Sequence, residues 1–169
     1  MNYIIYSAEN VLIGEFGKEH REFISINEVP EALKNAIIAA EDEHFWRHHG
    51  IDFVGIGRAA LANVSARGAR QGASTITMQV ARNFFLSSEK TFTRKFNEAL
   101  LAIKIERNLT KNQILELYIN QIYLGQRAYG FAAASKIYFG KPLTQASLAE
   151  VSMLAGLPKA PSKYNPVVN

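Results

Sequence analysis

The sequence predicts a mainly α-helical protein that carries a small β-hairpin at its amino end. Three observations support this fold class. The 169-residue chain is 48% hydrophobic and 20% charged, which is typical of a single globular domain. Strand-like runs are confined to the first 16 residues, whereas helix start and stop signals recur from Pro30 to Pro158.

The amino-terminal segment contains two short runs that are typical of β-strands. Residues 3–7 and 11–16 flank the tripeptide Ala8-Glu9-Asn10, where a turn is expected. We therefore expect residues 1–26 to form a β-hairpin and a linker ahead of a domain that covers residues 27–169.

Helix signals divide the remainder of the chain into seven segments. Pro30 suits the first turn of a helix, and Asp52 can cap the helix that follows. Thr110 and Gln113 form a capping-box pattern, and Pro158 lies just beyond the last segment. The predicted helices cover about residues 30–43, 52–66, 74–84, 91–108, 110–122, 128–138 and 144–155.

The distribution of charge indicates an anionic partner. The chain has a net charge of +4 and an isoelectric point near 9.3, which favours binding of phosphate, nucleic acid or an acidic membrane surface. Residues 82–111 hold seven Lys or Arg and three Glu, so this segment carries the whole excess of positive charge. Phenylalanines lie between these cations, which suits a membrane interface, a nucleic-acid strand or an ordinary core.

Composition also excludes several classes of structure. The chain has no cysteine, so it forms neither disulfides nor thiolate metal sites. No run of about 18 uninterrupted apolar residues occurs, so neither a membrane-spanning segment nor a signal peptide is expected.

Two adjacent acids, Glu41 and Asp42, follow the apolar run at residues 36–40. Burial at the edge of a core and the negative end of the helix dipole both disfavour a charged carboxylate there. Such a carboxylate suits proton transfer. The alternative is a pair of ordinary solvated acids at a helix end.

A third acid, Glu98, follows Arg94 by four residues and Lys95 by three, so these side chains share one helical face. This pattern fits a carboxylate beside two cations in a site that binds an anion, or a solvent-exposed ladder of ion pairs.

Upstream, the basic, glycine-bearing segment 67–73 precedes Ser74 and Thr75. Either hydroxyl can cap a helix whose free N–H groups favour anions.

These features occur in five ordered blocks that resemble the peptidoglycan glycosyltransferase (transglycosylase, glycosyltransferase family 51) domain of class A penicillin-binding proteins, and within that group the 1A type. The likeness covers roughly residues 10–168. The blocks are Glu41-Asp42-x-x-Phe45-x-x-His48-x-Gly50, Gly72-Ala73-Ser74-Thr75-Ile76-Thr77-x-Gln79, Arg94-Lys95-x-x-Glu98, Ile114-Leu115-Glu116-x-Tyr118-x-Asn120-x-x-Tyr123-x-Gly125, and the segment from Ala128-Tyr129-Gly130 to Tyr138-Phe139-Gly140-Lys141. Met78 departs from the usual Gln, and Arg82 from a frequent Lys.

The resemblance implies a lysozyme-like, two-lobe glycosyltransferase domain whose smaller, membrane-facing lobe covers about residues 67–97. It implies polymerisation of lipid II with inversion at the donor's anomeric carbon and release of undecaprenyl pyrophosphate. Glu41 would be the general base and Glu98 the second catalytic acid. The substrate-binding residues that it implies are Asp42, Phe45, His48, Gly72, Ser74, Thr75, Gln79, Arg82, Asn83, Arg94, Lys95, Tyr118 and Asn120.

The same resemblance implies partners and a location. The partners are lipid II, the growing lipid-linked glycan, a membrane surface and a transpeptidase domain in the parent chain, with no nucleic acid. The location is the outer face of a bacterial cytoplasmic membrane, with the anchor outside this chain. Glu98 is a candidate ligand for Mg²⁺ or Mn²⁺, and no organic cofactor is expected. The alternatives are a lysozyme-like glycoside hydrolase and a non-catalytic, basic membrane-binding adaptor.

Overall fold

A computed structural model describes residues 3–8, 12–16, 19–65, 74–85 and 91–167. The strands are β1 (Tyr3–Tyr6), β2 (Leu12–Phe16), β3 (His20–Arg21) and β4 (Ala128–Tyr129). The α-helices are α1 (Glu31–Glu41), α2 (Phe53–Ser65), α3 (Ile76–Phe85), α4 (Phe92–Asn108), α5 (Lys111–Gln121), α6 (Phe131–Phe139) and α7 (Leu148–Gly156). The described part of the chain is therefore mainly helical, as predicted.

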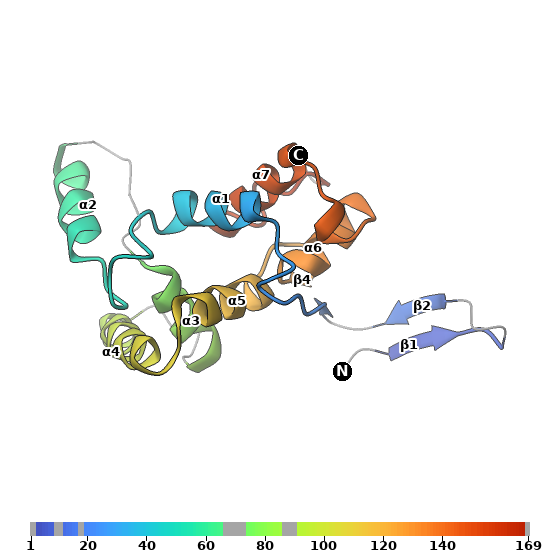
Figure 1. Cartoon of the computed structure of the whole chain (residues 1–169), viewed down its shortest axis with the longest axis horizontal. Helices are drawn as coiled ribbons and strands as arrows, with labels where there is room; N and C mark the ends of the chain where they lie inside the picture. Colours follow the sequence, from blue (N-terminus) through green and yellow to red (C-terminus); the bar gives the residue numbers. More distant parts are fainter. Residues whose placement is uncertain (1–2, 9–11, 17–18, 66–73, 86–90, 168–169) are drawn as a thin grey trace.

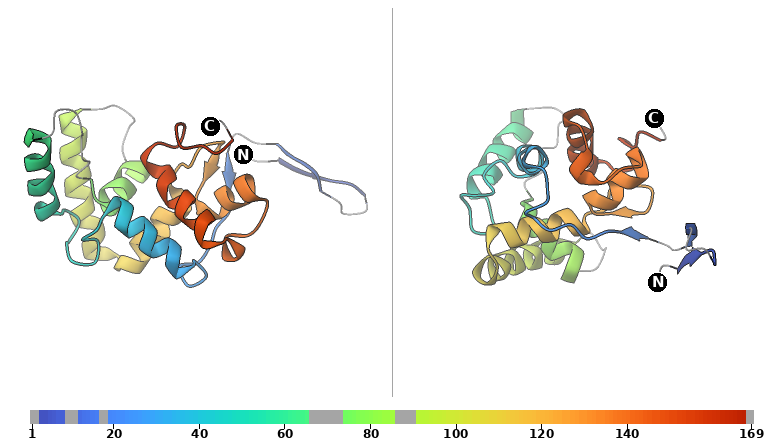
Figure 2. Two further views of the ribbon diagram at one scale, coloured as in Figure 1. Left: turned by 90° about the horizontal axis from the view of Figure 1, so that it is seen from above. Right: turned by 45° about the vertical axis from the view of Figure 1, so that its right-hand side comes forward.

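The amino-terminal hairpin is present where the sequence predicts it. Strands β1 and β2 pair antiparallel, and Tyr3 lies opposite Phe16. The register shifts between Ile5 and Tyr6, which marks a bulge or irregularity in the ladder. Figures 1 and 2 show this hairpin at one end of the molecule, apart from the helices, with α2 at the opposite end.

Helix α1 begins after Pro30, as predicted, but ends at Glu41 rather than near Glu43. Asp42 leaves the helical region with φ of −159°, while its backbone N–H still bonds to the carbonyl of Ile38. The side chain of Asp42 accepts a hydrogen bond from the backbone of a distant helix, which accounts for this earlier end. Glu41 is thereby the last helical residue.

Side-chain caps begin the next helices. The Asp52 carboxylate accepts a 2.9 Å hydrogen bond from the Gly55 N–H at the start of α2. Thr75, rather than Ser74, caps α3, because its hydroxyl accepts a 3.1 Å bond from the Met78 N–H. Thr91 caps α4 in the same way. The predicted caps of α2 and α3 are thus confirmed.

The predicted capping box of α5 is also present. The Thr110 hydroxyl accepts from the backbone N–H of Gln113, and the Gln113 side chain accepts from the backbone N–H of Thr110. The predicted helix 110–122 corresponds to α5 with the cap and one terminal residue excluded.

The predicted helix at 128–138 begins too early. Ala128 and Tyr129 form β4, which pairs parallel with β3, and the helix begins at Phe131. Gly130 separates the two elements with φ of +87°, and a Cβ there would lie 2.8 Å from the Asn120 carbonyl oxygen. This close approach to α5 requires glycine and excludes a continuous helix through the position.

The predicted helix at 144–155 is likewise shorter. A 3-10 turn, η1 (Leu143–Gln145), precedes α7, which Ser147 and Glu150 begin with a second capping box. This Ser-x-x-Glu signal is present in the sequence but is not among the predicted helix starts. The chain then forms the 3-10 turn η2 (Leu157–Lys159), with Pro158 inside it.

The core lies between α1, α3, α5, α6 and α7. Helix α1 packs against α7, and α3 packs against both α4 and α5. Each of α1, α3 and α7 contributes a side chain with 0% exposure to this core, namely Ile37, Ile76 and Leu154. The core therefore connects the carboxyl end of α1 with the amino end of α3. No helix of the described residues is long and apolar enough to cross a membrane.

Candidate active site

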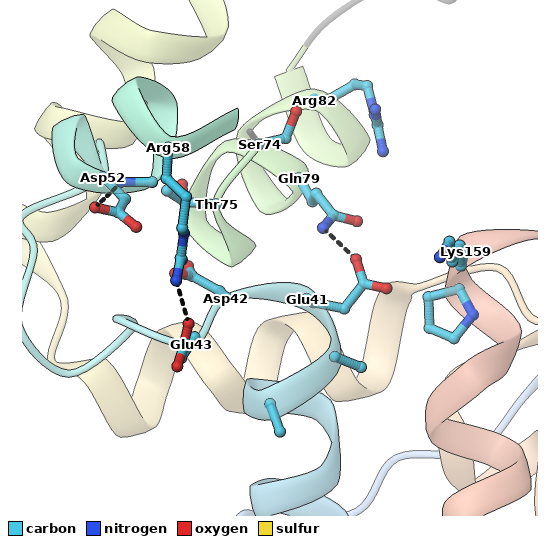
Figure 3. Close-up of a pocket in the computed structure, with 14 residues that line it drawn as sticks. Glu41, Asp42, Glu43, Asp52, Arg58, Ser74, Thr75, Gln79, Arg82 and Lys159 are labelled. Atoms are coloured by element: carbon cyan, nitrogen blue, oxygen red, sulfur yellow. Dashed lines mark hydrogen bonds and ion pairs between the residues drawn. The ribbon is translucent and has the colours of Figure 1, made fainter. Parts of the chain in front are cut away.

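An open cleft of about 440 Å³ lies at the carboxyl end of α1. One wall comes from α3 and the residues before it, another from α2, and a third from η2 (Figure 3). Its lining residues are Ala39, Ala40, Glu41, Asp42, Glu43, Asp52, Gly55, Arg58, Ser74, Thr75, Gln79, Arg82, Pro158 and Lys159. Six of the site residues implied by the sequence meet here: Glu41, Asp42, Ser74, Thr75, Gln79 and Arg82.

Glu41 is the partly exposed carboxylate at the end of α1. Its Oε2 accepts a 2.9 Å hydrogen bond from Nε2 of Gln79, one turn into α3 (Figure 3). Gln79 is buried, so its position depends on the packing of α3. A carboxylate that a buried amide holds on one oxygen, beside an open cleft, is oriented for contact with a ligand.

Asp42, in contrast, is a buried structural carboxylate. It accepts a 2.9 Å bond from the Ile76 N–H at the start of α3 and a bond of similar length from Nε2 of His48. Nδ1 of His48 lies 3.1 Å from the Gly50 nitrogen and accepts its N–H. We therefore assign the ring proton of His48 to Nε2.

The same network fixes the loop before α2. The Thr75 hydroxyl donates a 2.7 Å bond to the Gly50 carbonyl. Gly50 has φ of +95°, and a Cβ there would lie 2.8 Å from the backbone of Ala102 on α4. Asp42, His48 and Thr75 thus join the end of α1 to the start of α3, with α4 directly behind them.

The basic cluster on α4 adjoins the cleft through Ser74. Nζ of Lys95 donates a 2.8 Å bond to the Ser74 hydroxyl and a 2.7 Å bond to Oε2 of Glu98. Glu98 is buried, with 1% of its surface exposed, and its Oε1 lies 3.5 Å from Nε of Arg94. The shared helical face inferred from the sequence is therefore a partly buried ion-pair cluster, rather than an exposed ladder.

Glu98 does not fit a metal ligand in this arrangement. Lys95 occupies one carboxylate oxygen and Arg94 faces the other. Across the part of the chain that the structure describes, no group of three or more His, Cys, Asp or Glu side chains is placed to hold a metal ion. Two cations beside one buried carboxylate suit binding of an anion.

Tyr118 lies close to Glu41 and Arg82 but within the core. Its side chain is fully buried, and its hydroxyl has no hydrogen-bond partner among the described residues. Burial raises the pKa of Tyr118 well above its usual value of 10, and the negative charge of Glu41 adds to the shift. The hydroxyl therefore remains neutral beside the cleft.

The second wall contributes residues that no sequence motif places in a site, although Asp52 was predicted as a helix cap. Arg58 on α2 forms a 2.8 Å ion pair with Glu43, and it lowers the pKa of Glu43 below its usual value (Figure 3). Burial acts to raise the pKa of Asp52, but the Gly55 N–H and the His44 ring outweigh burial, and the pKa is lowered. No short motif marks Arg58 or Asp52 as cleft residues, because α2 reaches the cleft through tertiary packing.

Several other predicted site residues do not line this cleft. Phe45 is fully buried, with its ring 4.5 Å from the Lys111 ammonium. The Asn120 amide bonds to the backbone of Ile24 and Glu116. Asn83 is exposed on α3 outside the lining, and Gly72 lies outside the described residues. Their substrate-binding roles stay predictions, as does the extent of the lobe at 67–97.

Comparison with known proteins identifies the family. A family model described as "Transglycosylase" matches residues 9–169. The chain belongs to the transglycosylase family. The resemblance inferred from the five sequence blocks is therefore confirmed, and the enzyme class is confirmed at the level of the family.

Two curated relatives show how this transglycosylase domain relates to longer proteins. Penicillin-binding protein 1A of Neisseria cinerea is 63% identical over 169 residues, which are 100% of this chain and 21% of that protein. Penicillin-binding protein 1A of Pseudomonas aeruginosa is 52% identical over 165 residues, which are 98% of this chain and 20% of that protein. The transglycosylase domain thus spans about a fifth of the length of these relatives.

A solved structure supports the fold class. The crystal structure of penicillin-binding protein 1A from Haemophilus influenzae matches the whole of this transglycosylase domain with a TM-score of 0.51 and 28% sequence identity. The match covers 16% of that chain. The predicted fold class, a mainly helical glycosyltransferase domain with a small β element, is confirmed.

Proposed function

We propose that this transglycosylase domain polymerises lipid II into glycan strands, with Glu41 as the general base. The observation that carries the proposal is the position of Glu41. Its carboxylate lies at an open cleft, Gln79 holds one of its oxygens, and Arg82, a cation without an ion pair among the described residues, lines the same cleft. The family of the chain supports the reaction class. The substrates would be a lipid-linked glycan as donor and lipid II as acceptor.

The proton step uses the free oxygen of Glu41. One carboxylate oxygen accepts from Gln79, which leaves the other oxygen to take the proton from the 4-hydroxyl of the acceptor sugar. The acceptor oxygen attacks the donor's anomeric carbon as the bond to the polyprenyl pyrophosphate breaks, so that carbon is inverted. The electron pair of the broken bond leaves on the pyrophosphate.

Cations would stabilise the charge that develops on the leaving group. Arg82 lines the cleft directly, and Lys95 is bonded to the cleft residue Ser74. Preorganised positive charge at a developing anion is commonly a large catalytic contribution. Glu98 accepts from Lys95, so its proposed role is to position that cation and Arg94 rather than to exchange a proton.

The remaining cleft residues would bind and orient substrate. Ser74 precedes α3, and its hydroxyl, which accepts from Nζ of Lys95, would contact a phosphate oxygen of the substrate. Thr75, whose hydroxyl caps α3 and bonds to Gly50, would hold that segment in place. Asp42 and His48 would position the site without contacting substrate, because their hydrogen bonds hold the start of α3 against the end of α1. A divalent cation remains a prediction that the donor set around Glu98 does not support.

The proposed setting is the outer face of a bacterial cytoplasmic membrane. Large apolar side chains are exposed on α4, including Phe92 at 97% and Phe96 at 64%, and Phe53 on α2 is 75% exposed. Exposed apolar residues beside cations suit an interface with lipid. A transpeptidase domain in the parent chain is proposed from the full length of the penicillin-binding protein 1A relatives.

The test is polymerisation of purified lipid II in detergent, with product length read on a gel. We expect long glycan from the wild-type chain and none from Glu41→Gln, because the amide keeps the shape but cannot take a proton. Glu31→Gln is the matched control, since Glu31 lies at the far end of the same helix and outside the cleft. Thermal unfolding checks that all three proteins are folded.

Other outcomes would favour the alternatives. Release of short fragments from a preformed glycan, without polymer from lipid II, would identify a lysozyme-like hydrolase. Binding of lipid II that is unchanged in Glu41→Gln, with no product from either protein, would identify a non-catalytic membrane adaptor. Polymer of wild-type yield from Glu41→Gln would exclude Glu41 as the base.

A further inference from the structure

A group of polar side chains that the proposed mechanism does not use joins α3, α4 and α5. We call Thr77, Glu106 and Lys111 the Glu106 cluster. Glu106 lies near the end of α4, and its side chain is only 5% exposed. Its Oε1 accepts a 2.7 Å hydrogen bond from the Thr77 hydroxyl and a 2.7 Å bond from Nζ of Lys111 at the start of α5. One carboxylate of α4 therefore bonds to both neighbouring helices (Figure 1).

The Glu106 cluster also reaches the segment between α1 and α2. The Lys111 ammonium lies 4.5 Å from the centre of the Phe45 ring, and this ring is fully buried. The Phe45 N–H donates a 2.9 Å bond to the carbonyl of Asp42, the residue that follows α1. The cluster is thus in contact with the segment whose other acid, the Asp42 carboxylate, bonds to the start of α3.

Two acids from different elements fix the first turn of α3 at adjacent residues. Asp42 accepts the Ile76 N–H at 2.9 Å, and Glu106 accepts the Thr77 hydroxyl at 2.7 Å. Thr77 is fully buried as the second residue of α3. Negative charge is favourable at the amino end of a helix. Helix α3 can therefore neither rotate about its axis nor slide along it without loss of one of these two bonds.

The orientation of Gln79 depends on this turn. Gln79 follows Thr77 by two residues in α3, and its amide donates a 2.9 Å bond to Oε2 of Glu41. A group that takes part in catalysis must remain within about 0.5 Å of its productive position. Rotation of the first turn of α3 would move the Gln79 amide, and with it the Glu41 carboxylate at the cleft.

The Glu106–Lys111 pair is better suited to fixing geometry than to adding stability, because two charges removed from water regain little net free energy from their attraction. We propose that the Glu106–Thr77 contact positions the candidate base. Glu106, through Thr77, sets the rotation of α3 and thereby the orientation of the Gln79–Glu41 pair. Glu106 and Thr77 are positioning residues in this proposal, since neither lines the cleft. The inference rests on the proposed function.

The experiment measures initial rates of lipid II polymerisation over a range of lipid II concentrations. Thr77→Val keeps the branched shape of the side chain and removes only the hydroxyl that bonds to Glu106. We expect kcat to fall about five-fold and KM to change by less than about two-fold, because the orientation of the base matters chiefly in the transition state. Thr77→Ser, which keeps the hydroxyl, should restore most of kcat.

A double-mutant cycle with Gln79 separates positioning from a general loss of stability. If the contact acts through Gln79, Gln79→Ala should lower kcat about ten-fold in the wild-type background but only about two-fold in Thr77→Val. The second substitution then removes a hydrogen bond that is already misplaced. A purely structural role of Thr77 predicts the same ten-fold decrease in both backgrounds.

Ser135→Ala is the matched control. The Ser135 hydroxyl is also fully buried and donates a single 2.9 Å bond, but it lies on α6 and outside the cleft. The melting temperatures of Ser135→Ala and Thr77→Val should fall by similar amounts, while kcat of Ser135→Ala is unchanged. Amide hydrogen exchange adds a measurement that needs no activity: exchange at the start of α3 should be faster in Thr77→Val and unchanged in Ser135→Ala.

The proposal would be overturned by an unchanged kcat in folded Thr77→Val, by a rise in KM alone, or by independent effects of Thr77→Val and Gln79→Ala. Equal exchange at the start of α3 in wild type and Thr77→Val would also contradict it. Failure of the proposed function looks different, because the wild-type protein would then form no polymer. The exchange measurement would still decide whether the Glu106 contact fixes α3.

Discussion

Gln79 on α3 donates a 2.9 Å hydrogen bond from Nε2 to Oε2 of Glu41, the last residue of α1. The two residues lie 38 positions apart, and both line the cleft. One amide therefore connects the candidate base to the helix that carries Arg82. This contact makes the orientation of Glu41 depend on the packing of α3 against the core.

We expect Gln79→Ala to lower kcat for lipid II polymerisation about ten-fold, because loss of one hydrogen bond to a charged group corresponds to about 1.4 kcal/mol of orientation. The fold should persist, since the substitution leaves Ala, a good helix former, within α3. Initial rates at saturating lipid II measure the effect. Gln145→Ala, on the exposed turn η1, is the control. Equal rates for Gln79→Ala and wild type would contradict the positioning role.

Asp42 should contribute more to the free energy of unfolding than to the catalytic rate. Nε2 of His48 contacts both carboxylate oxygens of Asp42, and the Ile76 N–H donates to one of them, so in either orientation Asp42→Asn places an amide N–H₂ against the N–H of His48. We expect a decrease in the free energy of unfolding of about 2 kcal/mol, measured by urea titration. In the control, Glu31→Gln, the free energy of unfolding should change by less than about 0.5 kcal/mol. A change in Asp42→Asn no larger than in that control would show that the network is dispensable.

The Tyr118 hydroxyl is expected to contribute little to stability at neutral pH, because it is buried without a described partner. Tyr118→Phe should leave the free energy of unfolding unchanged or raise it by up to about 1 kcal/mol. Tyr118→Ala should lower it by about 4 kcal/mol through the cavity that it creates. A large loss of stability in Tyr118→Phe would indicate that a water or substrate group satisfies the hydroxyl.

Alkaline pH should also reveal the raised pKa of Tyr118. The unfolded chain releases this proton near pH 10, while the buried hydroxyl keeps it, so the free energy of unfolding falls as pH rises above 10. Tyr118→Phe should make the decrease of the free energy of unfolding with pH less steep. Denaturant titrations at pH values from about 9 to about 11 measure that dependence. Identical slopes in the two proteins would contradict the buried environment of the hydroxyl.

Acid pH should weaken the start of α7. Hydrogen bonds from Lys141 and Ser147 lower the pKa of Glu150 from 4.5 to about 2. The stability that Glu150 contributes is therefore fully present above pH 4.5 and is lost as pH falls toward 2. Glu150→Gln should be less stable than wild type at pH 7 and less sensitive to pH across that interval. Thermal unfolding of both proteins against pH tests this, and parallel curves would contradict it.

Local signals in the sequence were sufficient for most element boundaries. Thr110 and Gln113, or Asp52 and Gly55, lie three residues apart, so the hydrogen bonds that begin their helices depend only on nearby chain. The same reasoning placed Glu41 at the end of an apolar helix. The helix predicted over residues 128–129 is wrong, because these residues form β4 and pair with β3, more than a hundred positions earlier in the chain.

The helical class, the caps at Asp52 and Thr110, the family and Glu41 as the candidate base could all be predicted from the sequence, because each depends on short spacing or on ordered blocks. The burial of Glu98 beside Lys95, and the cleft that Lys159 and Arg58 share with Glu41, appear only in the folded chain. Those side chains come from α4, η2 and α2, elements far apart in the chain. Their proximity follows from core packing, which a pattern of nearby residues does not encode.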